Sequence, residues 1–154
     1  MTNDSMSRKP FSIPAHTHQV CGKPVRYFAP VNGSLDFPFV SLDDLLNAMP
    51  IPDDQKRIVA DKLAIGEYAD AVRVINTHGG QATIVPHYIC NGLIHAFTEN
   101  GLISPRFGAQ ITIGSYSAFK NINKGMSAQE RVSALFSIVK QDRDDDVAIE
   151  GGAA

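Results

Sequence analysis

The sequence predicts a single compact α+β domain in which two β-hairpins are interleaved with four short-to-medium helices. Its 154 residues suit one domain, and 44% hydrophobic with 19% charged residues is a globular composition. Turn-forming glycine and asparagine separate short runs rich in β-branched and aromatic residues. Between and after these runs, apolar residues recur every three or four positions, as in helices. We expect a flexible arm over residues 1–15, the domain over 16–140 and a disordered acidic tail over 141–154.

The first hairpin is predicted from residues 25–29 and 35–40, which flank the pair Asn32-Gly33. An Asn-Gly pair between two strand-like runs is a strong signal for a tight hairpin turn. Pro38 has no amide hydrogen to donate, so we expect it at a sheet edge or at a bulge.

Two helices are predicted next, joined by a tight proline turn. Ser41 with Asp44 three residues later resembles a capping box, and Pro50 ends the first helix. The second is predicted to begin at Asp53 and to end at Gly66. The pair resembles a helix-turn-helix corner, which also occurs in proteins that do not bind DNA. The side chains expected to face the core are Leu42, Leu45, Leu46, Met49, Ile58, Val59 and Leu63.

The second hairpin is predicted from residues 72–76 and 81–85, with its turn at 77–80. The glycines between these strands, Gly79 and Gly80, are expected to adopt positive φ in the turn. Pro86 follows the return strand and fits the first turn of a third helix.

The remaining elements are a short strand and a last helix. The third helix is predicted to end before Gly101. The run 110–113 is rich in β-branched residues and precedes Gly114, so we expect a strand followed by a turn. Ser127 and Glu130 form a capping box for the last helix. Its inward face is expected to comprise Val132, Leu135, Phe136 and Val139.

The histidines are the residues most suggestive of a metal site. His16 and His18 would share one face of a strand, and a set could be completed by His78, His87, His95 and Cys90. No compact metal-binding motif such as Cys-x-x-Cys is present. Cys90 lies close to His87 in the sequence, but no third group is evident to orient that pair. We therefore predict no catalytic residue, no metal and no cofactor, and keep a histidine-based metal domain as an alternative.

Two pairs of adjacent carboxylates and one pair of glycines have simple structural interpretations. Asp43-Asp44 and Asp53-Asp54 each lie at the start of a predicted helix, where their negative charges interact favourably with the positive end of the helix dipole. Gly79-Gly80 leads into a strand, so no helix N-terminus supports it as a phosphate site. None of these features calls for an enzyme.

Positive charge is concentrated late in the chain although the net charge is −2. Residues 101–140 contain five basic residues and one acidic residue, whereas residues 141–154 contain five acidic residues and one arginine. The basic residues lie among Phe107, Tyr116 and Phe119, a mixture typical of nucleic-acid contacts. Scattered solvated charges are the alternative. The predicted nucleic-acid-binding residues are Arg73, Arg106, Lys120 and Lys124.

Two segments within residues 23–98 resemble the BRO-N domain of viral and phage antirepressor-type proteins. VRYFAPVNGSLDFPFVSLDDLLNAM has its strand, turn, aromatic-rich strand and helix opening with an Asp. VRVINTHGGQATIVPHYICNGLIHAF has its strand, glycine turn, return strand and helix. Phe39 stands where the family often has the second aromatic of a Trp-Phe pair, and the family's charged stretch after the second helix is missing. The matching positions are Phe37 to Leu45, Gly80, Gln81, Gly92 and Leu93.

This resemblance implies a DNA-associated regulatory role in a phage or mobile element and supplies no catalytic residue. We predict a small cytoplasmic, non-catalytic protein of antirepressor type that binds DNA or a DNA-binding regulator. The sequence is compatible with both a monomer and a homo-oligomer. No apolar run approaches the roughly 18 residues that span a membrane, and no secretory signal is predicted. Cys21 and Cys90 match no disulfide framework and are expected to be reduced thiols. A protein-binding adaptor that does not bind DNA is the further alternative.

Overall fold

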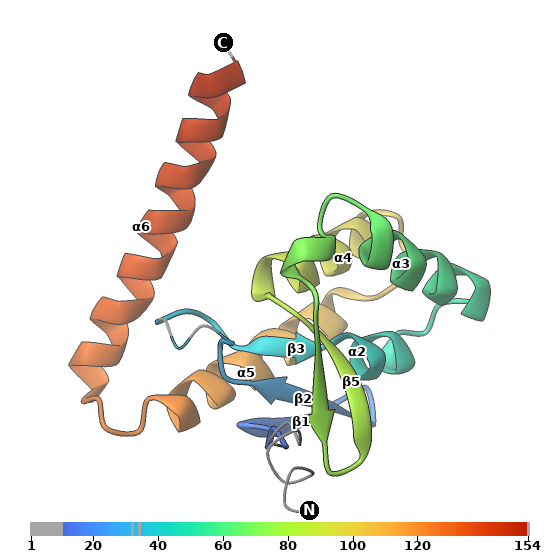
Figure 1. Ribbon diagram of the computed structural model, residues 1–154, viewed down its shortest axis with the longest axis horizontal. Coiled ribbons are helices and arrows are strands. Elements are labelled where there is room, and N and C mark those ends of the chain that lie inside the picture. The colour runs from blue at the N-terminus through green and yellow to red at the C-terminus, as the bar shows by residue number, and fades with distance from the viewer. Residues whose placement is uncertain (1–10, 32, 34, 154) are drawn as a thin grey trace, which may run out of the picture.

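The computed structural model describes residues 11–31, 33 and 35–153, with side chains described as far as residue 140. Helices pack around an antiparallel five-stranded sheet of order β1-β2-β3-β5-β4 (Figure 1), which confirms the α+β class. No helix in the described ranges is both long and apolar enough to cross a membrane. The strands are β1 (His16–Val20), β2 (Lys23–Phe28), β3 (Phe39–Ser41), β4 (Arg73–Thr77) and β5 (Gly80–Val85). The helices are α2 (Leu42–Ala48), α3 (Asp53–Ile65), a 3₁₀ turn η1 (Ala69–Ala71), α4 (His87–Glu99), α5 (Pro105–Ile122) and α6 (Ala128–Ala153).

The β1–β2 hairpin is an element that the sequence pattern did not predict. Val20 pairs with Lys23, so Cys21 and Gly22 form a two-residue turn, and both have positive φ (51° and 83°). Positive φ at both central residues is the geometry of a type I′ turn, which matches the twist of paired strands. β1 is an edge strand with alternating exposure, so its polar sequence carries little strand signal.

The predicted first hairpin is correct in its pairing and wrong in its turn. β2 and β3 are antiparallel, with Tyr27 opposite Val40. They are joined by residues 29–38 rather than by a two-residue turn. Gly33 has φ 68° and its amide donates to the carbonyl of Pro30, while Asn32 lies outside the described residues. Pro38 is buried directly before β3, a central strand, and therefore lies neither on a sheet edge nor within a strand.

Strand β3 has only three residues, and α2 continues the chain between β2 and β5. Beyond the end of β3, the amides of Arg26 on β2 and Thr83 on β5 therefore have no strand between them to accept their hydrogen bonds. Asp44 accepts from the Arg26 amide (3.0 Å), and Asp43 accepts from the Thr83 amide (2.8 Å). The Arg26 side chain also donates to Asp44 through Nε (2.7 Å) and Nη2 (3.2 Å). The paired carboxylates thus extend the sheet's hydrogen bonding, beyond the helix-capping role expected for them.

The N-terminus of α2 has the predicted cap, whereas α3 does not. Ser41 Oγ accepts from the Asp44 amide at 3.2 Å. Helix α3 has Pro52 at its N-cap and no side-chain cap hydrogen bond. Leu63 is buried as predicted, but Ile58, expected in the core, is 51% exposed.

The second hairpin has the predicted strands and turn position. Thr77 pairs with Gly80, and the Thr77 hydroxyl donates to the Gly80 carbonyl at 2.6 Å. Gly80 has φ 112°, but Gly79 does not have positive φ, so only one of the two glycines requires that conformation.

The last residues of the predicted arm are bound to the sheet. The Ser12 amide donates to the Asn76 carbonyl at 2.7 Å, and the Phe11 ring stacks on His78 with centroids 4.7 Å apart. The Ala15 amide donates to the Tyr27 carbonyl at 2.8 Å. Residues 1–10 of the predicted arm lie outside the described residues.

Helix α4 forms as predicted, but the expected strand at 110–113 is wrong. Asn100 caps α4, and Gly101 follows with φ 72°. The run 110–113 lies inside α5. Its β-branched residues favour a strand locally, but the buried positions of this segment recur at helical spacing and bury one face against the sheet. These buried residues are Phe107, Ile111, Gly114, Ala118 and Phe119.

The main core lies between one face of the sheet and helices α2, α4 and α5. A smaller cluster of Phe28, Phe39 and Ile84 lies on the opposite face. The largest side chains buried in the main core are Tyr27, Leu45, Met49, Val85 and Phe107.

Helix α6 has the predicted capping box but a different inward face. The Glu130 amide donates to Ser127 Oγ (3.1 Å), and the Ser127 amide donates to Glu130 Oε1 (3.3 Å). Ala134 and Ile138 are buried against Phe119 with Leu135 packed beside them, so the stripe is shifted from the expected one. Val132, Phe136 and Val139 are 50%, 71% and 56% exposed. The helix continues to Ala153 away from the sheet (Figure 1), where a disordered tail was expected.

Candidate nucleic-acid interface

Two of the four predicted binding residues, Arg106 and Lys120, lie on α5, and hydrogen bonds fix this helix to the β1–β2 hairpin and to the residue before it. Pro105 occupies the first turn, where its missing amide hydrogen costs nothing. Gln110 Oε1 accepts from the Cys21 amide (2.7 Å), and Asn121 Nδ2 donates to the Ala15 carbonyl (3.0 Å). The helix ends at Asn123, whose amide and side chain both donate to the Phe119 carbonyl (3.1 and 2.9 Å). The outer face of α5 is therefore held in a fixed orientation.

The middle of α5 approaches the sheet closely through Gly114. A β-carbon at this position would lie 2.5 Å from Tyr27 Oη and 2.7 Å from two ring carbons. Tyr27 is fully buried, and its hydroxyl donates to the Ile111 carbonyl at 2.9 Å. Burial raises the pKa of Tyr27, so this hydroxyl remains a proton donor at physiological pH. Gly114 is thus the contact that sets the distance between α5 and β2.

The outer face of α5 is a basic and aromatic stripe. Arg106, Ile113, Tyr116 and Lys120 are separated by 7, 3 and 4 residues, so they lie along one side of the helix. All four are exposed, and Lys120 Nζ lies 5.7 Å from the centre of the Tyr116 ring. The 18 residues of α5 include no aspartate or glutamate. We call these four residues the α5 stripe.

Three of the four predicted basic residues lie on α5 or directly after it. Arg106 and Lys120 belong to the α5 stripe, and Lys124 is exposed in the turn directly after the helix. Arg73 lies on the edge strand β4, where its guanidinium donates to the carbonyls of Asp70 and Val72. The Arg73 guanidinium is therefore partly occupied by hydrogen bonds to nearby backbone carbonyls.

Only one of the three aromatic residues noted in this segment is available to a ligand. Phe107 and Phe119 are buried in the core, 1% and 0% exposed, whereas Tyr116 is 48% exposed. Ile113, predicted within a strand, lies instead on the same helix face as Tyr116 and is 56% exposed.

The histidines of the alternative metal site are dispersed. His16 Nε2 and His18 Nδ1 are 3.3 Å apart on β1. His78 stacks on Phe11 at the β4–β5 turn, and His87 lies with Nδ1 3.6 Å from Asp36 Oδ1. Within the described residues no group of three or more His, Cys, Asp or Glu side chains could hold a metal ion.

The His16–His18 pair predicts a pH effect on stability. Partial burial, and then the charge of His18, lower the pKa of His16 from the usual 6.5. The unfolded chain therefore binds this proton at higher pH than the folded chain, so the free energy of unfolding should fall as the pH drops below about 6.5. Urea titrations between about pH 8 and 5.5 should show a smaller fall for His16→Gln than for wild type. His95→Gln, on an exposed helix surface, is the control; identical pH profiles for wild type and His16→Gln would contradict the prediction.

Cys90 does not have the environment of a nucleophilic thiol. It is 1% exposed on the inner face of α4, and burial raises its pKa to about 12. The sulfur therefore remains protonated at neutral pH, and the side chain acts as a small core residue.

No protein-family model, curated protein or solved structure matches this chain.

Proposed function

We propose that this chain is a small, non-catalytic regulatory protein of antirepressor type that binds DNA through the α5 stripe and Lys124. The observation that carries this proposal is an exposed helix face with cations and an aromatic ring and no acidic residue along the helix. The resemblance of residues 23–98 to the BRO-N domain supports the regulatory class. Arg73 is proposed as a weaker, peripheral contact.

The spacing of the cations suits a phosphate backbone. Arg106 and Lys120 are 14 residues apart, which corresponds to about 21 Å along a helix. Lysine and arginine held at this separation on a rigid helix can contact phosphates several nucleotides apart without reading bases, and this electrostatic attraction provides most non-specific affinity. Tyr116 adds a flat surface beside Lys120 for a sugar or a base.

Binding to a fluorescein-labelled DNA duplex, measured by anisotropy, tests this proposal. With three phosphate contacts, affinity should fall about 40-fold between about 50 and 200 mM salt. The absence of binding even at the lower salt would contradict DNA binding, because the electrostatic attraction is strongest there.

A protein-binding adaptor is the second candidate, favoured by apolar side chains exposed around α3 and α4. Ile58, Ile65, Tyr68 and Tyr88 are all at least 48% exposed. An adaptor without DNA affinity would show no anisotropy change with DNA. A protein that uses both surfaces would bind DNA whether or not a partner occupies the apolar side chains around α3 and α4.

A further inference from the structure

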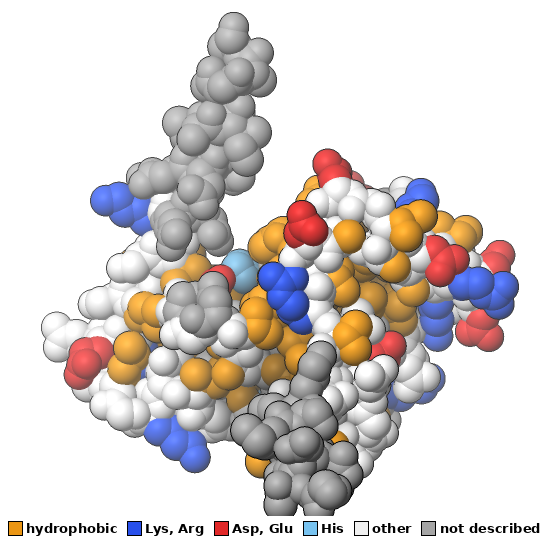
Figure 2. Space-filling model, in the orientation of Figure 1, with side chains coloured by type: hydrophobic (Ala, Val, Ile, Leu, Met, Phe, Trp, Pro, Cys, Tyr) orange, Lys and Arg blue, Asp and Glu red, His pale blue; other side chains and the backbone are white. Residues whose placement is uncertain are grey.

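Helix α3 exposes large apolar side chains to solvent. Of its apolar side chains only Leu63 is buried, while Ile58 and Ile65 are 51% and 86% exposed. Tyr68, just after the helix, and Tyr88 on α4 are 48% and 52% exposed. Figure 2 shows hydrophobic side chains gathered at the surface on the side formed by α3 and α4, with charged groups around them. Contiguous apolar surface of this kind marks interaction sites.

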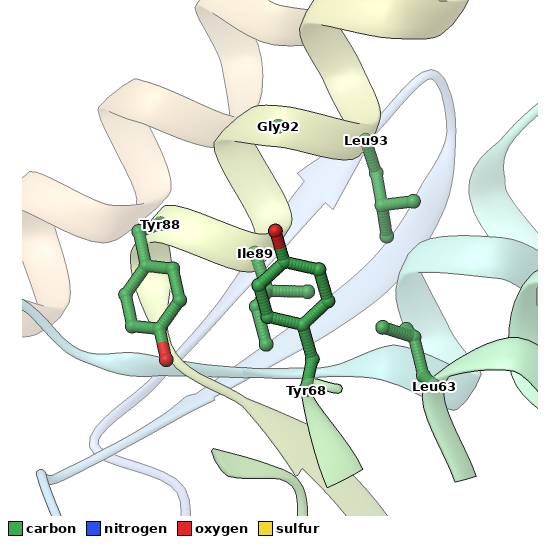
Figure 3. Close-up of a pocket in the computed structure, with 6 residues that line it drawn as sticks. All are labelled: Leu63, Tyr68, Tyr88, Ile89, Gly92 and Leu93. Carbon is green, nitrogen blue, oxygen red and sulfur yellow. The ribbon is translucent and has the colours of Figure 1, made fainter. Parts of the chain in front are cut away.

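These side chains surround a groove between α3 and α4. A hollow of about 290 Å³ is lined by Leu63, Ile89 and Leu93 together with the rings of Tyr68 and Tyr88 (Figure 3). A neighbouring hollow of about 510 Å³ shares Tyr68 and is lined further by Asp61, Lys62, Ile65, Gly66 and Glu67. Tyr68 borders both hollows, which therefore lie next to each other at the C-terminal end of α3.

Gly92 lies on the wall of the first hollow, inside α4. A β-carbon built at Gly92 meets nothing within 4 Å, so packing within the described residues does not require glycine. Glycine is also among the least favourable residues inside a helix. Its absence of a side chain keeps the groove open and lets another backbone approach α4 closely.

The segment that forms the α3 border of the groove, residues 53–70, carries an excess of negative charge. Residues 53–70 contain five acidic residues (Asp53, Asp54, Asp61, Glu67 and Asp70) and three basic ones (Lys56, Arg57 and Lys62), a net charge of −2. Asp61 and Glu67 line the second hollow, where Lys62 is the one cation. The partner that complements this border is basic.

We propose that the groove binds an amphipathic helix of a protein partner, with its apolar side chains between Tyr68 and Tyr88 and its basic side chains facing Asp61 and Glu67. Helix-in-groove recognition uses this combination of an apolar trough and a charged rim. The groove includes no residue of the α5 stripe, so this inference stands apart from the proposed DNA contact.

A designed helix tests the proposal on the full chain. A labelled leucine-lysine peptide of about four helical turns should bind, and the same peptide with glutamate in place of lysine should bind at least about tenfold more weakly. Equal affinities for the two peptides, or no binding of the lysine peptide, would overturn the proposal.

Substitutions in the groove locate the binding site. Tyr68→Ala and Gly92→Leu should each weaken the lysine peptide at least about fivefold. Tyr116→Ala is the matched control, because Tyr116 and Tyr68 are both 48% exposed. A loss in Tyr116→Ala as large as in Tyr68→Ala, or no loss in Tyr68→Ala, would overturn the assignment to this groove. Tyr68→Ala should leave duplex affinity unchanged, so the two binding proposals can fail separately.

Discussion

Gly114→Ala is expected to lower the free energy of unfolding by about 3 kcal/mol. The added methyl group would lie 2.5 Å from the hydroxyl oxygen and 2.7 Å from two ring carbons of Tyr27, which is fully buried and cannot swing into solvent. Overpacking of a core costs up to about 3 kcal/mol, and displacement of the Tyr27 hydroxyl from the Ile111 carbonyl adds about 1 kcal/mol. The better helix propensity of alanine offsets about 1 kcal/mol.

Gly92→Ala provides the matched control for that substitution. Both glycines lie inside helices, but a β-carbon at Gly92 meets nothing within 4 Å. Gly92→Ala should therefore stabilise the protein by up to about 1 kcal/mol. Urea unfolding followed by far-UV circular dichroism measures both variants. A Gly114→Ala protein as stable as wild type would show that α5 does not approach Tyr27 as the structure has it.

Asp44→Ala is expected to cost about 2–3 kcal/mol, the second large effect. Asp44 accepts three hydrogen bonds from Arg26, one from its backbone and two from its guanidinium. The side chains of Arg26 and Asp44 are only 27% and 19% exposed, so alanine would leave a partly buried cation and a strand amide without their acceptor.

Asp54→Ala is the comparison that isolates this role. Asp54 also lies in the first turn of a helix, and among the described residues its carboxylate accepts only from the adjacent Gln55 amide. Its loss should cost about 0.5 kcal/mol, as expected for a dipole contribution alone. Equal losses from Asp44→Ala and Asp54→Ala would mean that Asp44 is only a helix-dipole residue and does not join α2 to β2.

Features determined by neighbouring residues could be predicted from the sequence. The Ser41 cap, the helix end before Gly101 and the Ser127–Glu130 box all involve contacts within a few residues, and the structure contains each of them. The β4–β5 hairpin likewise follows from alternation around a short glycine turn. These signals do not depend on the rest of the fold.

Features determined by distant contacts could not be predicted. The β-branched run 110–113 favours a strand, but packing of α5 against Tyr27 selects a helix, and small residues at Gly114 and Ala118 hide its buried stripe. The second function of Asp43 and Asp44 depends on β2 and β5 lying on either side of α2. No pattern within one segment records that arrangement.

The basic residues of the candidate site could be predicted from the sequence, but their arrangement on one exposed helix face could not. Arg106, Lys120 and Lys124 follow from composition alone, whereas their relation to Tyr116 and Ile113 depends on the helical geometry of α5. Exposure also had to come from the structure, since Phe107 and Phe119 belong to the core.

The most direct test of DNA binding through α5 compares two variants that each lose three positive charges. One carries Arg106→Gln, Lys120→Gln and Lys124→Gln; the other carries Lys56→Gln, Arg57→Gln and Lys62→Gln on α3. Duplex affinity is measured for both across a range of salt concentrations. The α5 variant should lose most of its affinity, and the slope of log affinity against log salt should become shallower by about 3, while the α3 variant should stay close to wild type. Equal losses in the two variants would contradict a binding surface on α5.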